Sequence, residues 1–277
     1  METNYSVLMS VYKKEKPEYF IESIESMLKQ TVKPEQIVIV KDGPLTEKLD
    51  NVVDKYKELF PNIFTVVPLD KNLGLGLALN EGLKKCRNEL VARMDTDDIS
   101  LERRCELQLS EFTKDTKLSI CGTMIDEFFN TPDNIVTSRI VPENHDEILK
   151  FSRRRSPFNH VTVMFKKEDV LSTDGGYRDI LRKEDIDLFI RMLTRGFKGK
   201  NINQSLVLVR SDEGYYRRRK SWLNCKGYIK AIYESWKLGH SKTVDLLFVV
   251  LTQMGMFLAP VWLLKTVSDK FLRTKKN

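Results

Sequence analysis

Three carboxylates follow a short apolar run in the segment VARMDTDDIS, residues 91–100. Asp95, Asp97 and Asp98 repel one another at this spacing, and unpaired acids resist burial. Solvent, the neighbouring Arg93 or a divalent cation could supply the balancing charge. Carboxylate oxygens at this spacing suit Mg²⁺ or Mn²⁺, which proteins commonly bind through a few acids together with substrate phosphates. We therefore predict a metal site. The alternative, in which Asp97 or Asp98 caps a following helix, leaves Asp95 without a partner.

A second acidic group opens the segment RKEDIDLFIRM. Glu184, Asp185 and Asp187 lie close together there, and a positioned carboxylate can take a proton from a substrate hydroxyl. Salt bridges to Arg182 or Lys183 are the structural alternative. Local chemistry alone does not choose among the three acids.

The elements that must position these acids alternate between strands and helices across about the first hundred residues. Four apolar runs of strand length cover residues 6–12, 36–40, 63–67 and 89–94. Apolar residues at helical spacing separate them, which predicts a parallel sheet. Ligands of such sheets gather outside the C-terminal strand ends. The polar residues expected at or near that edge are Tyr12, Asp42, Asp70, Asn72, Asp95 and Asp97.

The second half of the chain has a different pattern and predicts a mixed sheet. The strands expected there cover residues 118–129, 135–141, 160–165 and 205–210. Two helices are expected at residues 100–112 and 182–196. The apolar face of the second helix consists of Ile186, Phe189, Ile190 and Leu193.

Two glycines in NLGLGLALNEG, Gly74 and Gly76, have the spacing that begins a dinucleotide-binding fingerprint. Leu79 stands where the third glycine of that fingerprint should fall, which excludes it. We expect Gly74 to make a turn that opens a helix. Phosphate binding by the same loop is the alternative.

The charge balance favours anionic partners. Lys and Arg outnumber Asp and Glu by 46 to 39, which gives a net charge of +7 and a pI near 9.1. The basic clusters all lie in the second half, at residues 153–155, 217–220 and 273–276, where solvated surface explains each of them equally well. No nucleic-acid-binding motif or aromatic platform accompanies them, so we expect no nucleic-acid partner.

The cysteines and histidines do not predict a zinc site. The cysteines have no metal-binding spacing, and the three histidines are too few and too scattered. The N-terminal segment METNYSVLMSVYKKE lacks the basic-then-apolar order of a signal peptide. These features predict a protein of the reducing cytoplasm.

Near the C-terminus, residues 246–264 form an apolar stretch without a charged residue, which just reaches bilayer-spanning length. Polar and helix-breaking residues weaken the spanning interpretation: Thr252, Gln253, Gly255 and Pro260. With Trp262 near its end and basic residues after it, the stretch predicts a helix at the membrane interface. A buried helix or a dimer contact is the alternative.

Six segments, taken in order, resemble a known family. SVLMSVYKKE, SMLKQT, IVIVKDG, NLGLGLALNEGL, VARMDTDD and KEDIDLFIRM occur in the order and approximate spacing of the inverting family 2 glycosyltransferases with the GT-A fold. The sequence looks like bacterial members that build capsule, O-antigen or exopolysaccharide. The resemblance covers roughly residues 5–215. Ser10 departs from the proline of many members, which concerns turn geometry more than chemistry.

The resemblance implies an α/β fold of the GT-A type, with a Rossmann-like nucleotide-sugar-binding sheet, a mixed-sheet acceptor half and a C-terminal helical appendage. We therefore expect a glycosyltransferase domain at residues 1–220, which divides into a nucleotide-binding half (1–99) and an acceptor half (100–220). Residues 221–277 are expected to form a helical segment that associates with the membrane.

The resemblance also implies roles on the donor side. Tyr12 matches the position that contacts the nucleobase, and Asp42 matches the acid that accepts a hydrogen bond from uracil, which suits a UDP-sugar. Asp95 matches the first acid of the DxD motif, near the ribose and the metal, while Asp97 matches the acid that ligates Mn²⁺ or Mg²⁺. Asn72 is assigned to the donor side with them. Such a cation would neutralise charge that develops on the leaving diphosphate.

On the acceptor side, Asp185 matches the aspartate of the family's ED motif. That aspartate takes the proton of the acceptor hydroxyl as the hydroxyl attacks the anomeric carbon, so the configuration inverts. Glu184 and His160 are further acceptor-side candidates, and a structural role is the alternative for His160.

The expected function is sugar transfer from a nucleotide-sugar donor to a saccharide or lipid-linked saccharide acceptor in bacterial surface polysaccharide synthesis. It is expected at the inner face of the cytoplasmic membrane, with peripheral membrane contact. A non-catalytic, membrane-associated nucleotide-sugar-binding protein is one alternative, which the intact ED segment disfavours. A nucleotide-sugar pyrophosphorylase is another, but SVYKKEKP stands where its glycine-rich, arginine-containing loop should be.

Overall fold

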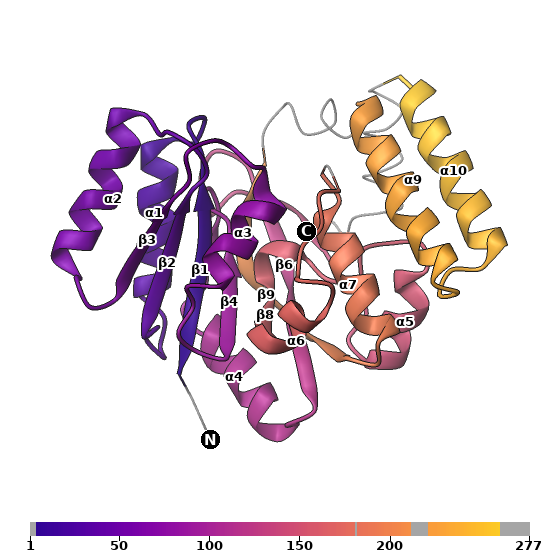
Figure 1. Cartoon of the computed structure of the whole chain (residues 1–277), viewed down its shortest axis with the longest axis horizontal. Coiled ribbons are helices and arrows are strands. Elements are labelled where there is room, and N and C mark those ends of the chain that lie inside the picture. Colours follow the sequence, from indigo (N-terminus) through magenta and orange to yellow (C-terminus); the bar gives the residue numbers. More distant parts are fainter. Residues whose placement is uncertain (1–3, 181, 212–220, 261–277) are drawn as a thin grey trace.

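One mixed β-sheet runs through the protein, and helices cover both of its faces (Figure 1). The structure is a computed structural model that describes residues 4–180, 182–211 and 221–260. Alternate residues of a strand point to opposite faces of a sheet. Accordingly, Val7 and Met9 belong to one hydrophobic core, and Leu8 between them belongs to a second core on the other face.

The first half of the sheet is parallel, as the sequence predicts. Its strands are β1 (Tyr5–Val11), β2 (Gln36–Lys41), β3 (Phe64–Pro68) and β4 (Leu90–Met94). They lie in the order β3-β2-β1-β4 and all pair in parallel. Three helices connect them: α1 (Pro17–Leu28), α2 (Glu47–Leu59) and α3 (Leu75–Leu83). The C-terminal ends of these strands therefore share one edge.

The second half of the sheet is mixed. Its strands are β5 (Ile99–Ser100), β6 (Leu118–Phe128), β7 (Ile135–Arg139), β8 (Met164–Lys166) and β9 (Lys198–Arg210). The order continues from β4 through β8, β6 and β9 to β5, and β7 pairs with β6. Strand β8 is antiparallel to both β4 and β6, whereas β6 and β9 are parallel. The two halves therefore form one continuous sheet.

The prediction of a strand over residues 160–165 was wrong in its first half. Residues His160–Thr162 form a short 3-10 helix, η1, and β8 begins only at Met164. The backbone turns because Thr162 donates both its N–H and its hydroxyl to the carbonyl oxygen of Asn159, each at 2.9 Å. Such local side-chain hydrogen bonds compete with strand pairing.

Helices complete both faces of the second half. They are α4 (Arg104–Lys114), α5 (His145–Ser152), α6 (Lys167–Ser172) and α7 (Glu184–Thr194). The predicted apolar face of α7 is buried, and Leu188 and Met192 are buried as well. Because α7 is buried on most of its surface, the start of this helix is held firmly against the rest of the protein.

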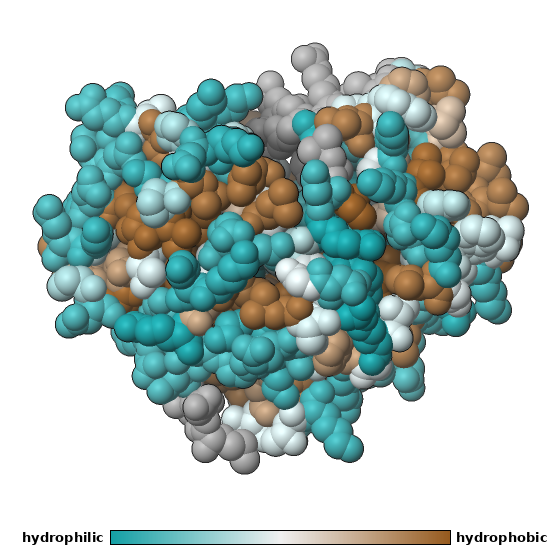
Figure 2. Space-filling model, in the orientation of Figure 1, coloured by the Kyte–Doolittle hydropathy of each residue, from teal (hydrophilic) through white to brown (hydrophobic). Residues whose placement is uncertain are grey.

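Two further helices, α9 (Trp222–Lys237) and α10 (Thr243–Leu258), pack against each other and onto α7. Hydrophobic side chains gather over α10 at the right edge of the molecule (Figure 2). Within the described ranges, no helix is long and apolar enough to cross a membrane. The basic residues 217–220 and 273–276 and the end of the apolar stretch, residues 261–264, lie outside the described residues.

Candidate functional site

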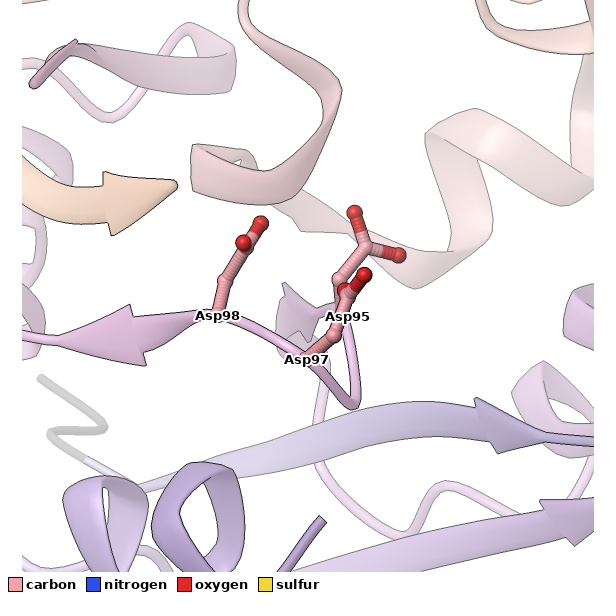
Figure 3. Close-up of side chains that lie close together, drawn as sticks. All are labelled: Asp95, Asp97 and Asp98. Carbon is pink, nitrogen blue, oxygen red and sulfur yellow. The ribbon is translucent and has the colours of Figure 1, made fainter. Parts of the chain in front are cut away.

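The three predicted acids project from the turn between β4 and β5 (Figure 3). One carboxylate oxygen from each of Asp95, Asp97 and Asp98 lies within 4.8 Å of the others. Ser23 of α1 fixes this turn by donating its hydroxyl to the carbonyl oxygen of Asp95, at 2.6 Å. The turn therefore concentrates negative charge at the C-terminal edge of the sheet.

Asp95 is balanced by Arg93, one of the sources of positive charge that the sequence allows. The buried guanidinium of Arg93 donates from both terminal nitrogens to the two carboxylate oxygens of Asp95, with one of these bonds at 2.6 Å. The side chain of Arg93 is 2% exposed, and that of Asp95 is 34% exposed. A two-point bond of this kind fixes the orientation of the Asp95 carboxylate.

Asp98 has a structural partner, and its proposed role as a helix cap is wrong, as is that of Asp97. Strand β5 follows the acids, and α4 begins only at Arg104 without a side-chain cap. The buried Asp98 carboxylate instead accepts the backbone N–H of Arg210 at 2.8 Å. Burial, with repulsion from Asp97 and Asp95, raises the pKa of Asp98 well above its usual range. Asp98 therefore ties the turn to the end of β9.

Asp97 is the exposed member of the group, and its carboxylate has no ion-pair partner among the described residues. Surrounding protein atoms, followed by repulsion from Asp95 and Glu15, raise the pKa of Asp97 to about 7. Negative charge is therefore concentrated at Asp97, where a bound cation would relieve the repulsion. Carboxylate oxygens with excess negative charge are the donor set that Mg²⁺ and Mn²⁺ prefer, so Asp97 and Asp95 fit such an ion.

Asp42 organises the loop that leads into α3. Its carboxylate accepts the backbone N–H of Leu73 at 2.6 Å and that of Gly74 at 3.2 Å, together with the side-chain amide of Asn72 at 2.9 Å. Gly43 allows this close approach, because a Cβ there would lie 2.7 Å from the backbone nitrogen of Asn72. Asp42 and Asn72 therefore act together in shaping the edge beside β2.

The structure brings the predicted donor-side residues to the same edge. Tyr12 directly follows β1, and its side chain is 44% exposed. The loop that it begins returns to the acids, because Thr96 donates its hydroxyl to Glu15 at 2.6 Å. Gly74 precedes α3 with a φ of +87°, which confirms the predicted turn at the start of that helix.

The three acids at the start of α7 differ in their burial and in their ion-pair partners. Asp187 is buried and accepts from Arg178 at 2.9 Å and from Arg191 at 2.8 Å. These ion pairs make Asp187 a structural residue and remove it as a candidate base. Glu184 and Asp185 are half-buried in the first turn of α7, where the helix dipole favours negative charge.

Glu184 faces α3 across a very short gap. A Cβ at Gly76 would lie 2.9 Å from the Cβ of Glu184, so only glycine permits this approach. Burial, with repulsion from Asp185, raises the pKa of Glu184 to about 7. A small pocket opens between the start of α3 and the loop before α7, with Leu73, Gly74 and Arg178 among its lining residues.

His160 is linked to α7 through its contacts with Tyr177 and Phe189. Its Nε2 is 2.9 Å from the hydroxyl of Tyr177, and its ring packs edge-on against Phe189 of α7. Burial, with repulsion from Arg93, lowers the pKa of His160 well below its usual range. His160 is therefore neutral at physiological pH.

Arg93 connects the two acidic groups, whereas the sequence offered it only as a source of balancing charge for the first group. Its charge lowers the pKa of Glu184 and that of Asp98, although burial raises both. Burial raises the pKa of Tyr177. The charge of Arg93 lowers this pKa, and the charges of Asp185 and Asp95 raise it. The signal in the sequence was an arginine inside a buried strand, where an unpaired charge is costly.

Comparisons with known proteins agree on one family. The family model described as glycosyl transferase family 2 matches residues 6–189. The amylovoran biosynthesis glycosyltransferase AmsE of Erwinia amylovora is 38% identical over 236 residues, which cover 84% of this chain and 85% of that protein. A UDP-Gal:alpha-D-GlcNAc-diphosphoundecaprenol beta-1,3-galactosyltransferase of Escherichia coli is 36% identical over 275 residues, 97% of this chain and 98% of that protein.

Solved structures share the fold. The mannosyltransferase PcManGT of Pyrobaculum calidifontis, in complex with GDP-Man and Mn²⁺, has a TM-score of 0.67 at 16% identity and covers 95% of this chain and 72% of that one. S. aureus TarS 1–349 in complex with UDP has a TM-score of 0.60 at 18% identity, with coverage of 84% and 70%. These likenesses confirm the predicted GT-A fold.

Proposed function

The chain belongs to glycosyl transferase family 2, and from this premise we propose that it transfers a sugar from a UDP-sugar to a lipid-linked saccharide, with a divalent cation and with inversion. Its relatives are glycosyltransferases of bacterial polysaccharide synthesis, which favours glycosyl transfer over pyrophosphorylase activity. The observation that carries the proposal is the convergence of two acidic groups, one after β4 and one at the start of α7, around Arg93 and Tyr177.

The first acidic group suits the donor. In the proposal, the exposed ring of Tyr12 contacts the base, and the Asp42 carboxylate, which the loop of Leu73 and Gly74 holds in place, accepts a hydrogen bond from uracil. Asn72 holds that carboxylate in place, at 2.9 Å. Asp95, oriented by Arg93, lies on the ribose side.

Asp97, with Asp95, is proposed to hold Mn²⁺ or Mg²⁺ together with the donor diphosphate. The ion would neutralise negative charge that develops on the departing nucleoside diphosphate. Asp97 suits this role because its carboxylate is exposed and has no ion-pair partner among the described residues.

The second acidic group suits the acceptor. Asp185 is proposed to take the proton of the acceptor hydroxyl while the hydroxyl oxygen bonds to the anomeric carbon. The bond from that carbon to the diphosphate oxygen breaks on the opposite face, and the electron pair leaves with the diphosphate, so one displacement inverts the configuration. Glu184 and the neutral His160 are proposed to contact the acceptor. Asp187 is excluded as the base because two arginines hold its carboxylate.

The acceptor is proposed to be lipid-linked and to be met at the inner face of the cytoplasmic membrane. The name of the Escherichia coli relative, which aligns over 97% of this chain, specifies a diphosphoundecaprenol-linked acceptor. The sequence division into a transferase domain at 1–220 and a membrane-associating segment at 221–277 belongs to the same proposal.

A thermal-shift panel of nucleotide sugars, with Mn²⁺ or with EDTA, tests the donor proposal. Ligands that bind the folded state raise its melting temperature. In Mn²⁺, UDP-sugars should raise the melting temperature of the full chain more than GDP-mannose does. The same UDP-sugars should raise it less in EDTA than in Mn²⁺. Release of UDP from the best donor should then follow. A protein stabilised by none of the donors would contradict the proposal, and stabilisation without any transfer or hydrolysis would indicate a non-catalytic binding protein.

A further inference from the structure

Helix α10 exposes a row of apolar side chains along one face. Val244, Leu247, Phe248, Leu251 and Leu258 are between 49% and 72% exposed. Their spacing places them on one side of the helix. A contiguous apolar row of this kind on a surface marks contact with another apolar phase or partner.

The buried face of α10 is partly polar and its exposed face is apolar. A helix at a surface that faces water has the opposite arrangement, with apolar residues buried and polar residues exposed. Asp245 and Gln253 are 5% and 9% exposed, and the Oε1 of Gln253 has no hydrogen-bond partner in the described structure. Asp245 is held by Arg154 at 2.5 Å and accepts the N–H of Lys242 at 2.9 Å. The helix is therefore anchored by Val249, which packs against α7 and α9, and by the polar contacts of Asp245, while it turns an apolar row outward.

A basic groove of about 840 Å³ lies beside this row, between the residues around α5 and the start of α10. Its basic lining residues are Lys150, Arg153, Arg154, Arg155 and Lys242. Two acids also line it, and one of them, Asp245, is already paired with Arg154. The Nε of Arg153 is buried without a hydrogen-bond partner in the described structure. The groove is therefore suited to an anion.

The groove and the apolar row form one surface. Val244 belongs to both. The guanidinium of Arg154 lies 4.8 Å from the ring centroid of Phe248, which places a groove cation directly over the row. Positive charge at the edge of an exposed apolar helix face is the arrangement of helices that lie in an anionic membrane interface.

We infer that this surface docks on a bilayer of anionic phospholipids, with lipid phosphates in the basic groove and the α10 row among the acyl chains. A second copy of the chain would bring the same excess of positive charge, whereas anionic lipid supplies the complementary charge. The inference rests on the membrane-associating segment of the proposed function and names its surface and the class of lipid, while docking itself requires neither donor nor metal. It also gives the surface by which a lipid-linked acceptor would be approached.

Flotation of the full chain with vesicles tests the inference, using phosphatidylcholine alone or an equal mixture of phosphatidylcholine and phosphatidylglycerol. The full chain should float with both, and more strongly with the anionic mixture. Lys150→Ala with Arg155→Ala should weaken binding to anionic vesicles about fivefold per residue, which corresponds to about 1 kcal/mol each, and leave neutral vesicles unaffected. Leu247→Ser with Leu251→Ser should weaken binding to both vesicles by about tenfold or more.

Matched control variants lie on α2, at the opposite end of the molecule (Figure 1). Lys48→Ala with Lys57→Ala removes two exposed lysines, and Leu59→Ser removes a leucine that is 59% exposed. Both controls should float as the unmodified chain does. UDP binding should be unchanged in every variant, so a failure of the proposed function is detected separately.

Three outcomes would overturn the inference. The first is a full chain that floats with neither vesicle. The second is unchanged flotation of the groove and row variants. The third is a leucine variant that loses self-association in sedimentation or melts at a lower temperature, because the row would then be a dimer interface or part of the core.

Discussion

The Arg93–Asp95 ion pair gives the sharpest prediction about stability. Arg93→Met removes a guanidinium that is 2% exposed and leaves the Asp95 carboxylate, 34% exposed, without its two-point partner. Removing one partner of a fully buried pair costs about 3–5 kcal/mol. Water reaches part of Asp95, so we expect about 2 kcal/mol here. That cost corresponds to a melting temperature lower by about 4–8 °C for a domain of this size.

The loss should also alter the acids of α7. Arg93 lowers the pKa of Glu184, so without it the pKa should rise further above about 7. Arg93→Lys keeps the positive charge but loses the two-point hydrogen bond to Asp95. Its melting temperature should therefore lie between those of Arg93→Met and the unmodified protein. Arg103→Met provides a matched control, because it removes an arginine from a surface pair with Glu106 and should melt close to the unmodified protein.

A double-mutant cycle with Asp95→Asn isolates the pair. If the two side chains stabilise each other, Arg93→Met with Asp95→Asn is less destabilised in reversible urea unfolding than the sum of the single variants. Additive losses, or an Arg93→Met protein that melts at the unmodified temperature, would refute the reasoning about this pair.

Three further substitutions probe other parts of the site. Asp97→Asn should abolish metal-dependent donor turnover and weaken UDP binding, measured by calorimetry, more in Mn²⁺ than in EDTA; unchanged turnover in a folded variant would remove the metal assignment. Gly76→Ala should slow transfer strongly and lower the melting temperature only slightly, because the added Cβ would lie 2.9 Å from the Cβ of Glu184 and displace that side chain. An unchanged transfer rate would show that the close approach of α3 to Glu184 is not needed. Asp187→Asn loses the ion pairs with two arginines, so it should lower the midpoint of urea unfolding, while the folded fraction keeps its transfer rate. A loss of transfer without any loss of stability would return Asp187 to the catalytic candidates.

Much of the sheet was predictable because its signal is local. Buried parallel strands read as short apolar runs, and the polar residues that end them share an edge once the strands are parallel. Tyr12, Asp42, Asn72 and Asp95 were assigned to that edge on this ground. The error at residues 160–165 has a local cause too, since Thr162 bonds back to Asn159 and turns a segment whose composition suits a strand.

The partners of the acids were not predictable, because they come from distant parts of the chain. Asp98 bonds to the backbone of Arg210, and Asp42 bonds to the backbone at Leu73, neither of which has a sequence signature. Among the acids of α7, spacing could not separate Asp187 from Asp185. The tertiary position of Arg178 separates them by pairing with Asp187.

The most direct test of the account compares Asp185→Asn with Glu184→Gln in donor binding and in sugar transfer. Both carboxylates start α7, and both substitutions keep size while removing charge, so each serves as the control for the other. Asp185→Asn should keep the affinity for the UDP-sugar and slow transfer by about two to four orders of magnitude, the range of a positioned general base. Greater damage from Glu184→Gln, or a comparable loss of donor affinity in Asp185→Asn, would contradict the assignment of Asp185 as the base.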